Sequence, residues 1–250
     1  MAKKQETKSK RRVIREQRIK RQRQQRMIII LVISGVAIII AGFLIIPSLQ
    51  RSLAPAGEVI QITPVDRPLE DGSALGDPAA PVLVEVWSDF QCPSCRNYSE
   101  NIEPLVVANY VANGKIRYVY RQFPFLDDSS LSKESDQAAH ASLCAADQGR
   151  FWDYHDILFA NWNSENIGAF RDKRLIAFAE ALNLDMDKFS ACFNGGDHQE
   201  EISKDIADGT RLGVSGTPSV FVNGKILTTG RVPSYEDVAA AIDAASKTGN

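Results

Sequence analysis

The pattern of apolar and polar positions first singles out residues 27–46, an uncharged and almost wholly apolar run. At about 1.5 Å per residue, a helix of this length spans about 30 Å, the thickness of a bilayer core. A buried core helix seldom lacks a polar face over such a length, and the apolar part of a cleaved signal peptide covers only about 7–15 residues. The run therefore predicts one uncleaved amino-terminal transmembrane helix.

Beyond residue 80 the pattern becomes that of a mixed α/β domain. Residues 82–87 form a continuous Val-rich run, which is typical of a strand buried on both faces. Apolar residues then recur at helical spacing between Pro93 and Asn113-Gly114. Residues 116–123 alternate between apolar and polar, like a second strand. This β-α-β order predicts two parallel strands joined by a right-handed crossover.

The second half of the domain reads as helices followed by a hairpin. Residues 130–212 carry helical patterns and no convincing strand. Two short strands, 219–222 and 225–228, flank Asn223-Gly224, a strong hairpin signal. A last helix is expected to begin at Ser234, three residues before an aspartate that would complete a capping box. We therefore expect an α/β fold with a helical insertion over about 130–212.

The charge distribution divides the chain in the same way as the apolar pattern. Residues 1–26 hold 12 Lys/Arg and 2 Asp/Glu, whereas the remaining 224 residues have a net charge of −12. Basic residues before a span predict a cytoplasmic tail over 1–26, a membrane anchor over 27–46 and an extracytoplasmic carboxy-terminal domain. Binding of nucleic acid or anionic lipid is the alternative role of the tail, but a topology signal is favoured, and no nucleic-acid partner is expected.

A linker is expected between the anchor and the domain. Residues 47–80 are rich in Pro, Gly, Ala, Ser and acidic residues, with one candidate edge strand over 59–63. The domain proper is expected to cover residues 81–250.

The candidate chemistry lies in Cys92-Pro93-Ser94-Cys95, where a strand gives way to a helix. A thiolate at a helix start accepts backbone N–H bonds and is stabilised by the helix dipole, so its pKa falls. Cys92 is therefore the candidate nucleophile, and Cys95, one turn into the helix, is the candidate resolving thiol.

Two alternatives for this pair are weaker. A structural zinc site would need a second closely spaced ligand pair, and Cys144 and Cys192 are 48 residues apart in the sequence. A structural disulfide across so short a loop would add little stability. A redox-active pair is favoured, and neither a metal nor a cofactor is expected because the cysteines themselves carry the electrons.

Three sequence blocks carry a family resemblance. They are WSDFQCPSC at 87–95, AADQGRFWDYHDILF at 145–159 and GVSGTPSVFVNG at 213–224. In this order they resemble the DsbA-like branch of the thioredoxin superfamily over roughly residues 75–247. The resemblance implies a thioredoxin fold, with 130–212 as the helical insertion and a cis Pro218 against the active-site disulfide. It also implies that Thr217 pairs with an extended substrate segment next to Pro93 and Ser94.

The resemblance bears on four further residues. Some members of the family carry a second, structural disulfide, so a Cys144–Cys192 bond is expected. Several relatives place an acidic proton acceptor six positions before the first cysteine, where this chain has Val86. Glu85 and Asp89 are the candidates for this role, although Glu85 should point to the opposite side of the strand.

Two further expectations concern Ser94, which lies between the two active-site cysteines, and the three histidines. The most oxidising relatives have a histidine where this chain has Ser94, so a less oxidising pair is expected. Each of His140, His155 and His198 is expected to be a satisfied surface or core residue.

These observations favour a membrane-tethered, extracytoplasmic oxidoreductase that introduces disulfides into exported proteins with cysteines. By resemblance, a quinone-linked membrane partner of the DsbB or vitamin K epoxide reductase (VKOR) type would reoxidise it. The alternatives are a reductant or isomerase for specific partners, as in haem maturation, and a non-catalytic binding module.

Overall fold

The computed structural model describes residues 21, 26–27, 29–44, 46, 56–127 and 133–248. The chain divides into two units, Met1–Pro55 and Ala56–Asn250. In the first unit residues 29–44 are helical, and their large apolar side chains are exposed, as at Leu31 and Phe43.

The expected transmembrane helix over 27–46 is not confirmed. Among the residues that the structure describes, no helix is long and apolar enough to cross a membrane. Two residues of the predicted span, most of the basic tail over 1–26 and the first part of the predicted linker, 47–55, lie outside the described residues.

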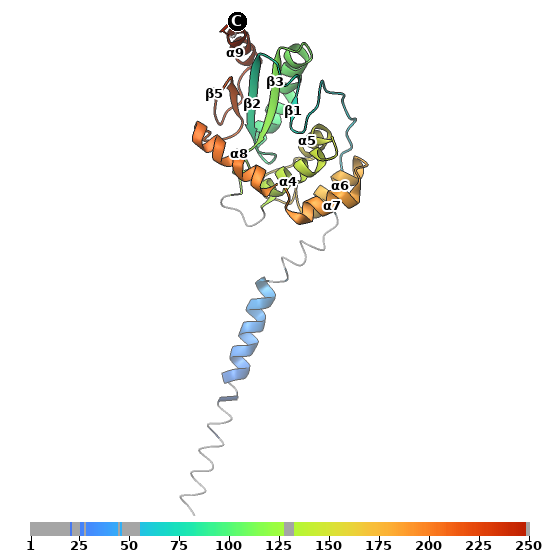
Figure 1. Cartoon of the computed structure of the whole chain (residues 1–250). Coiled ribbons are helices and arrows are strands. Elements are labelled where there is room, and N and C mark those ends of the chain that lie inside the picture. The colour runs from blue at the N-terminus through green and yellow to red at the C-terminus, as the bar shows by residue number, and fades with distance from the viewer. Residues whose placement is uncertain are drawn as a thin grey trace, which may run out of the picture. The chain divides into compact units, whose positions relative to one another are not determined.

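A five-stranded mixed sheet forms the centre of the second unit (Figure 1). Its order is β1-β3-β2-β4-β5, with β2 and β3 parallel and every other pair antiparallel. The predicted β-α-β unit and carboxy-terminal hairpin are both present. The strands are β1 (Ala74–Leu75), β2 (Val82–Ser88), β3 (Ile116–Gln122), β4 (Ser219–Val222) and β5 (Lys225–Thr228).

The helices fall into three groups along the chain. The crossover from β2 to β3 consists of α2 (Pro93–Asn101), α3 (Glu103–Val106) and η1 (Val107–Val111). Between β3 and β4 lie α4 (Glu134–Ala146), α5 (Phe151–Ala160), α6 (Asp172–Ala181), α7 (Met186–Gly195) and α8 (Gln199–Leu212). The chain continues from the hairpin into α9 (Tyr235–Thr248), where Ser234 Oγ accepts a hydrogen bond from the backbone N–H of Asp237 at 3.1 Å, as the predicted cap requires.

The central strand β2 sends alternate side chains to two different cores. Val84 and Val86 join the larger core, which continues into the helical insertion. Trp87 points to the other face and packs edge-on against Phe221, with ring centroids 4.8 Å apart. Gly209 lets α8 approach this second core closely, because a Cβ there would lie 2.6 Å from Nε1 of Trp87.

The candidate edge strand over 59–63 is absent, and the second compact unit covers Ala56–Asn250. The backbone at Ile60 instead pairs with the side chain of Asn161, whose Oδ1 accepts at 2.8 Å and whose Nδ2 donates at 2.9 Å. Arg67 forms an ion pair of 2.8 Å with Asp156 on α5. These polar contacts with the helical insertion replace strand pairing, and β1 takes the edge position next to β3.

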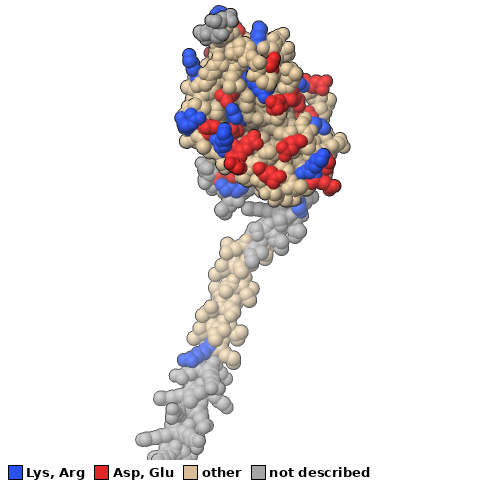
Figure 2. All heavy atoms as spheres, in the orientation of Figure 1, with Lys and Arg blue, Asp and Glu red and all other residues tan. Residues whose placement is uncertain are grey.

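Charged side chains of both signs are interspersed on the face of this unit that Figure 2 shows.

Candidate active site

The two active-site thiols lie at the first turn of α2. Cys92 occupies the position just before the helix, with an extended backbone, and Pro93 opens the first turn. The side chains of Cys92 and Cys95 are buried, with 5% and 1% of their surface exposed, and both are free thiols in this structure. Pro93 is exposed and Ser94 is half-buried, so the surface beside the two cysteines is formed by these two residues.

The surroundings shift the pKa values of the two cysteines in opposite directions. A hydrogen bond from the Cys95 thiol lowers the pKa of Cys92 to about 6, and the backbone N–H groups of Ser94 and Cys95 add to this effect. Burial raises the pKa of Cys95 well above its usual value, although the hydroxyl of Ser88 partly offsets this by hydrogen bonding. The reduced pair therefore holds its charge on Cys92 and its proton on Cys95.

The loop before β4 lies against these sulfurs. The peptide bond between Thr217 and Pro218 is cis. The sulfur of Cys92 lies 3.4 Å from the carbonyl oxygen of Thr217, which accepts a hydrogen bond from the thiol when Cys92 is protonated. Antiparallel pairing of β4 with β2, up to Trp87 opposite Ser219, brings this loop to the active-site end of β2.

Of the two candidate proton acceptors, Asp89 belongs to the site. Its side chain is 2% exposed, and burial raises the pKa of its carboxyl to about 7. The carboxylate accepts hydrogen bonds from the Ser135 hydroxyl at 2.7 Å, the Gln91 N–H at 2.8 Å and the Leu126 N–H at 3.1 Å. Charge on the Cys92 sulfur also raises the pKa of Asp89, so the protonation states of the two groups are linked.

Glu85 lies on the opposite side of β2, as the strand alternation predicts. It accepts hydrogen bonds from Nε and Nη2 of Arg121, at 3.0 and 2.8 Å. Arg121 also contacts Asp205 of α8 at 3.3 Å. Glu85 therefore belongs to an ion-pair cluster beneath α8 and does not contact the cysteines.

A buried polar network behind the active-site loop was not predicted from the sequence. Gln91 is fully buried, and its Nε2 donates to Asp127 Oδ1 at 3.2 Å and to Ser135 Oγ at 2.9 Å. Its Oε1 accepts from the Asn166 N–H at 2.6 Å, and its carbonyl accepts from Trp162 Nε1 at 2.6 Å. Gln91 lies within the block around the cysteines, but no spacing rule marks a buried glutamine, and its partners come from distant segments.

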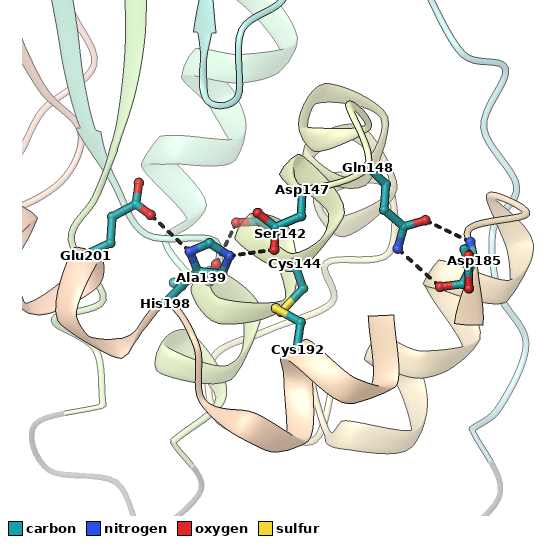
Figure 3. Close-up of a disulfide and its surroundings, with 9 residues drawn as sticks. All are labelled: Ala139, Ser142, Cys144, Asp147, Gln148, Asp185, Cys192, His198 and Glu201. Carbon is teal, nitrogen blue, oxygen red and sulfur yellow. Dashed lines mark hydrogen bonds and ion pairs between the residues drawn. A yellow bond between two sulfur atoms is a disulfide. The ribbon is translucent and has the colours of Figure 1, made fainter. Parts of the chain in front are cut away.

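The other two cysteines and the histidines lie in the helical insertion or beside it. Cys144 of α4 and Cys192 of α7 are joined by a disulfide with an S–S distance of 2.01 Å, so the structure has the expected bond (Figure 3). His155 is fully buried, and its Nδ1 lies 2.9 Å from Asp156. His198 contacts Asp147 and Glu201, whereas His140 is 4% exposed and its Nε2 has no hydrogen-bond partner among the described residues.

A family model described as Thioredoxin matches residues 69–244. The chain belongs to the thioredoxin family. Among relatives, the probable disulfide bond formation protein D of Bacillus cereus is 29% identical over 174 residues, covering 68% of this chain and 76% of that protein. The Na(+)/H(+) antiporter NhaA 3 of Salinispora tropica is 35% identical over 177 residues, which are 70% of this chain and 25% of the antiporter.

Solved structures share the fold. BdbD from Bacillus subtilis superposes with a TM-score of 0.63 at 21% identity, covering 76% of this chain and 100% of that chain. The α-DsbA1 of Wolbachia pipientis superposes with a TM-score of 0.59 at 25% identity, covering 73% of this chain and 94% of that chain. Together with the relatives, these structures show that this thioredoxin-family protein is a DsbA-like thiol–disulfide oxidoreductase.

Proposed function

We propose that this oxidoreductase donates its Cys92–Cys95 disulfide to the cysteine thiols of exported proteins. The low pKa of Cys92 carries this proposal. A stabilised thiolate favours the reduced enzyme over its disulfide, which makes the disulfide a better oxidant, and it also leaves readily in exchange.

The reaction has two exchange steps. A substrate thiolate attacks the Cys92 sulfur, the Cys92–Cys95 bond breaks, and Cys95 leaves and takes up a proton. A second substrate thiolate then attacks the substrate sulfur of the mixed disulfide. The product disulfide forms, Cys92 leaves as a thiolate, and two electrons have passed from substrate to enzyme.

Asp89 serves as the proton-exchanging group of these steps. The high pKa of Cys95 means that this sulfur must gain a proton on leaving and lose it again on reoxidation. A carboxyl group with a pKa of about 7 can exchange a proton near neutral pH. The extended substrate segment lies beside Pro93 and Ser94 and pairs with the backbone at Thr217.

A quinone-linked membrane protein of the DsbB or VKOR type would reoxidise the enzyme. Residues 27–46 would anchor it in the membrane, with the basic tail in the cytoplasm and the catalytic unit outside. The uncharged apolar run and the 12 basic residues before it support this topology. Extraction of cell membranes with alkaline carbonate should leave the chain in the membrane pellet, and external protease should digest the catalytic unit in spheroplasts.

The reduction potential of the Cys92–Cys95 pair tests the direction of electron flow. The full chain would be equilibrated in glutathione buffers, and the free thiols would be alkylated and counted by mass. A potential nearer the roughly −120 mV of DsbA than the roughly −270 mV of thioredoxin is expected. A value at the thioredoxin end would replace the proposed oxidase with a reductant.

Trapping the mixed disulfide tests the role of each cysteine. Cys95→Ser should accumulate covalent complexes with substrate proteins through Cys92, and these complexes should dissociate when a dithiol is added. Cys92→Ser is the matched control and should form none. Complexes formed equally well by both variants would contradict the assignment of Cys92 as the attacking sulfur.

A further inference from the structure

The Cys144–Cys192 disulfide lies within a cluster of potential metal ligands. His140 and Cys144 are four residues apart on α4 and therefore lie on one face of that helix, and α7 supplies Cys192. One ring nitrogen of His140 and the two sulfurs all lie within 4.8 Å of one another. The fold thus brings Cys192, which is 48 residues from Cys144 in the sequence, to the same place as His140 and Cys144.

His140 itself indicates that this cluster can bind a ligand. The residue is 4% exposed, and its Nε2 is buried without a hydrogen-bond partner among the described residues. Buried polar atoms are normally paired, because leaving one unpaired costs about 1–3 kcal/mol. A neutral imidazole has one nitrogen with a free electron pair, and this is the form that binds zinc.

A fourth ligand is available beside Cys192. Atoms of Asp147 and His198 lie within 4.8 Å of its sulfur and of each other. Figure 3 shows His198 between Asp147 and Glu201, and its Nε2 is 2.9 Å from Asp147 Oδ2. The Asp147 carboxylate can therefore supply the fourth ligand, with His198 as the hydrogen-bonding partner that orients it.

We propose that the reduced form of this cluster is a zinc site, formed by Cys144, Cys192, His140 and the Asp147–His198 pair. Two sulfurs, one imidazole and one further nitrogen or oxygen match the tetrahedral preference of Zn²⁺. The disulfide and the ion are alternatives, because both use the same two sulfurs.

The disulfide state and the zinc-bound state interconvert by thiol–disulfide exchange with a dithiol. A dithiol reduces the Cys144–Cys192 bond, is itself oxidised to a cyclic disulfide, and leaves two thiols on the protein. Zinc then binds both sulfurs as thiolates and displaces two protons to solvent. In the reverse direction an oxidised dithiol accepts two electrons from the zinc-bound thiolates and two protons from solvent, the protein disulfide forms again, and the ion is released. Helices α4 and α7 are thus cross-linked in either redox state.

The test uses the full chain with Cys92→Ser and Cys95→Ser, so that the active-site pair cannot bind metal. The protein is reduced with a phosphine, which does not compete strongly for zinc, and Zn²⁺ is titrated against a chromophoric chelator. One zinc ion per reduced chain and none per oxidised chain are expected. Cobalt in place of zinc should give the visible absorption of a tetrahedral site with thiolate ligands.

Two further variants distinguish a zinc site that includes His140 from nonspecific binding of zinc by the two thiols. His140→Gln should weaken zinc binding at least tenfold. His155→Gln replaces an equally buried imidazole that is not part of the cluster, and it should change zinc affinity less than threefold. Circular dichroism of each reduced variant reports whether it is folded. Failure of the reduced parent chain to retain zinc, or equal zinc affinity of the parent and His140→Gln, would overturn the proposal.

Zinc should also change the chemistry of the disulfide. Because the ion binds only the reduced form, saturating Zn²⁺ should slow reoxidation of Cys144 and Cys192 by oxidised dithiol at least tenfold. His140→Gln should remove most of this effect at the same zinc concentration. An equal rate of reoxidation with and without zinc would contradict binding at these sulfurs.

Discussion

Asp89 interacts with Cys92 both through a backbone hydrogen bond and through the charge of its side chain. Its carbonyl oxygen accepts the hydrogen bond of the Cys92 N–H at 3.0 Å, while its buried carboxylate and the Cys92 thiolate raise each other's pKa. The tight turn from Asp89 to Cys92 therefore holds a titratable carboxyl group near the candidate nucleophile.

The Asp89→Asn variant should separate these two roles. The backbone contact remains, but the proton-exchanging group and its negative charge are lost. We expect thiol–disulfide exchange near pH 7 to slow by about 10²-fold, a typical contribution of general acid–base catalysis. Stopped-flow tryptophan fluorescence would measure the rate. The pKa of Cys92 should fall further, and an unchanged rate would remove Asp89 from the mechanism.

Glu85→Gln is the matched control for this variant. It also neutralises a carboxylate, but in the middle of β2 and on the face beneath α8, where Glu85 contacts Arg121. We expect a loss of about 1 kcal/mol in the free energy of unfolding, since Arg121 keeps its contact with Asp205. The reduction potential should not change. A large shift in potential would show that the ion-pair cluster acts on the thiols after all.

The pH dependence of Cys92 follows from the sign of its pKa shift. The folded pKa of about 6 lies below the ordinary value of 9.0 for a thiol, so the folded state favours the thiolate. Stability from this group is therefore present above pH 9 and is lost as the pH falls through 6. The difference in unfolding free energy between the reduced protein and Cys92→Ser should therefore grow between pH 6 and pH 9.

The rate of alkylation provides a second measurement of the pKa of Cys92. The rate of Cys92 modification by iodoacetamide in the folded, reduced protein should rise with pH with a midpoint near 6. Cys95 should remain unmodified over this range, because it is 1% exposed and its pKa is raised. A midpoint close to that of an ordinary thiol would contradict the stabilised thiolate on which the proposed oxidase direction depends.

Sequence reasoning performed best where the determinants are local. The Asn223-Gly224 turn has both residues at positive φ, 47° and 72°, so two adjacent residues suffice to predict the hairpin. The Cys92–Cys95 spacing at a strand-to-helix junction likewise predicts the site from one short segment. Ile60 shows the limit, because its β-branched neighbourhood suggests a strand, yet Asn161, about 100 residues away, satisfies its backbone.

The choice between Glu85 and Asp89 also required the fold. Alternation along β2 predicts that Glu85 points away from the cysteines, but it does not show what Asp89 contacts. The buried partners of Asp89 include Ser135 at the start of α4, which reaches the loop only after the helical insertion packs. Such contacts are properties of tertiary structure, and no short-range pattern encodes them.

The Cys144–Cys192 disulfide should contribute strongly to stability. It cross-links residues 48 apart, and a loop of that length corresponds to about 4 kcal/mol in the chain-entropy model. The double variant Cys144→Ala, Cys192→Ala should lower the free energy of unfolding by about this amount in guanidinium denaturation. The slope of the transition should change as well if the unfolded state becomes more expanded.

Gly209 provides a test of the packing between α8 and the sheet. Alanine in place of a helical glycine usually stabilises a helix by about 0.5–1 kcal/mol. Here the new methyl group would lie 2.6 Å from Nε1 of Trp87 and 3.0 Å from the ring of Phe123. Gly209→Ala should therefore destabilise the protein by about 1–3 kcal/mol. Ser203→Ala, at an exposed site on the same helix, is the control and should have little effect on the thermal midpoint.

The pairing of β2 with β4 determines when the active site can form during synthesis. Val84 pairs with Val222, so the ribosome makes most of the catalytic unit before the sheet can close. Until then Cys92 has neither the Thr217 carbonyl nor the proline loop beside it, although Cys144 has already been synthesised. The nascent chain thus passes through an interval in which its most reactive sulfur is unshielded and a wrong partner is within reach. Helix α2 and the 92–95 spacing are local, and early pairing of Cys92 with Cys95 would protect the chain during this interval.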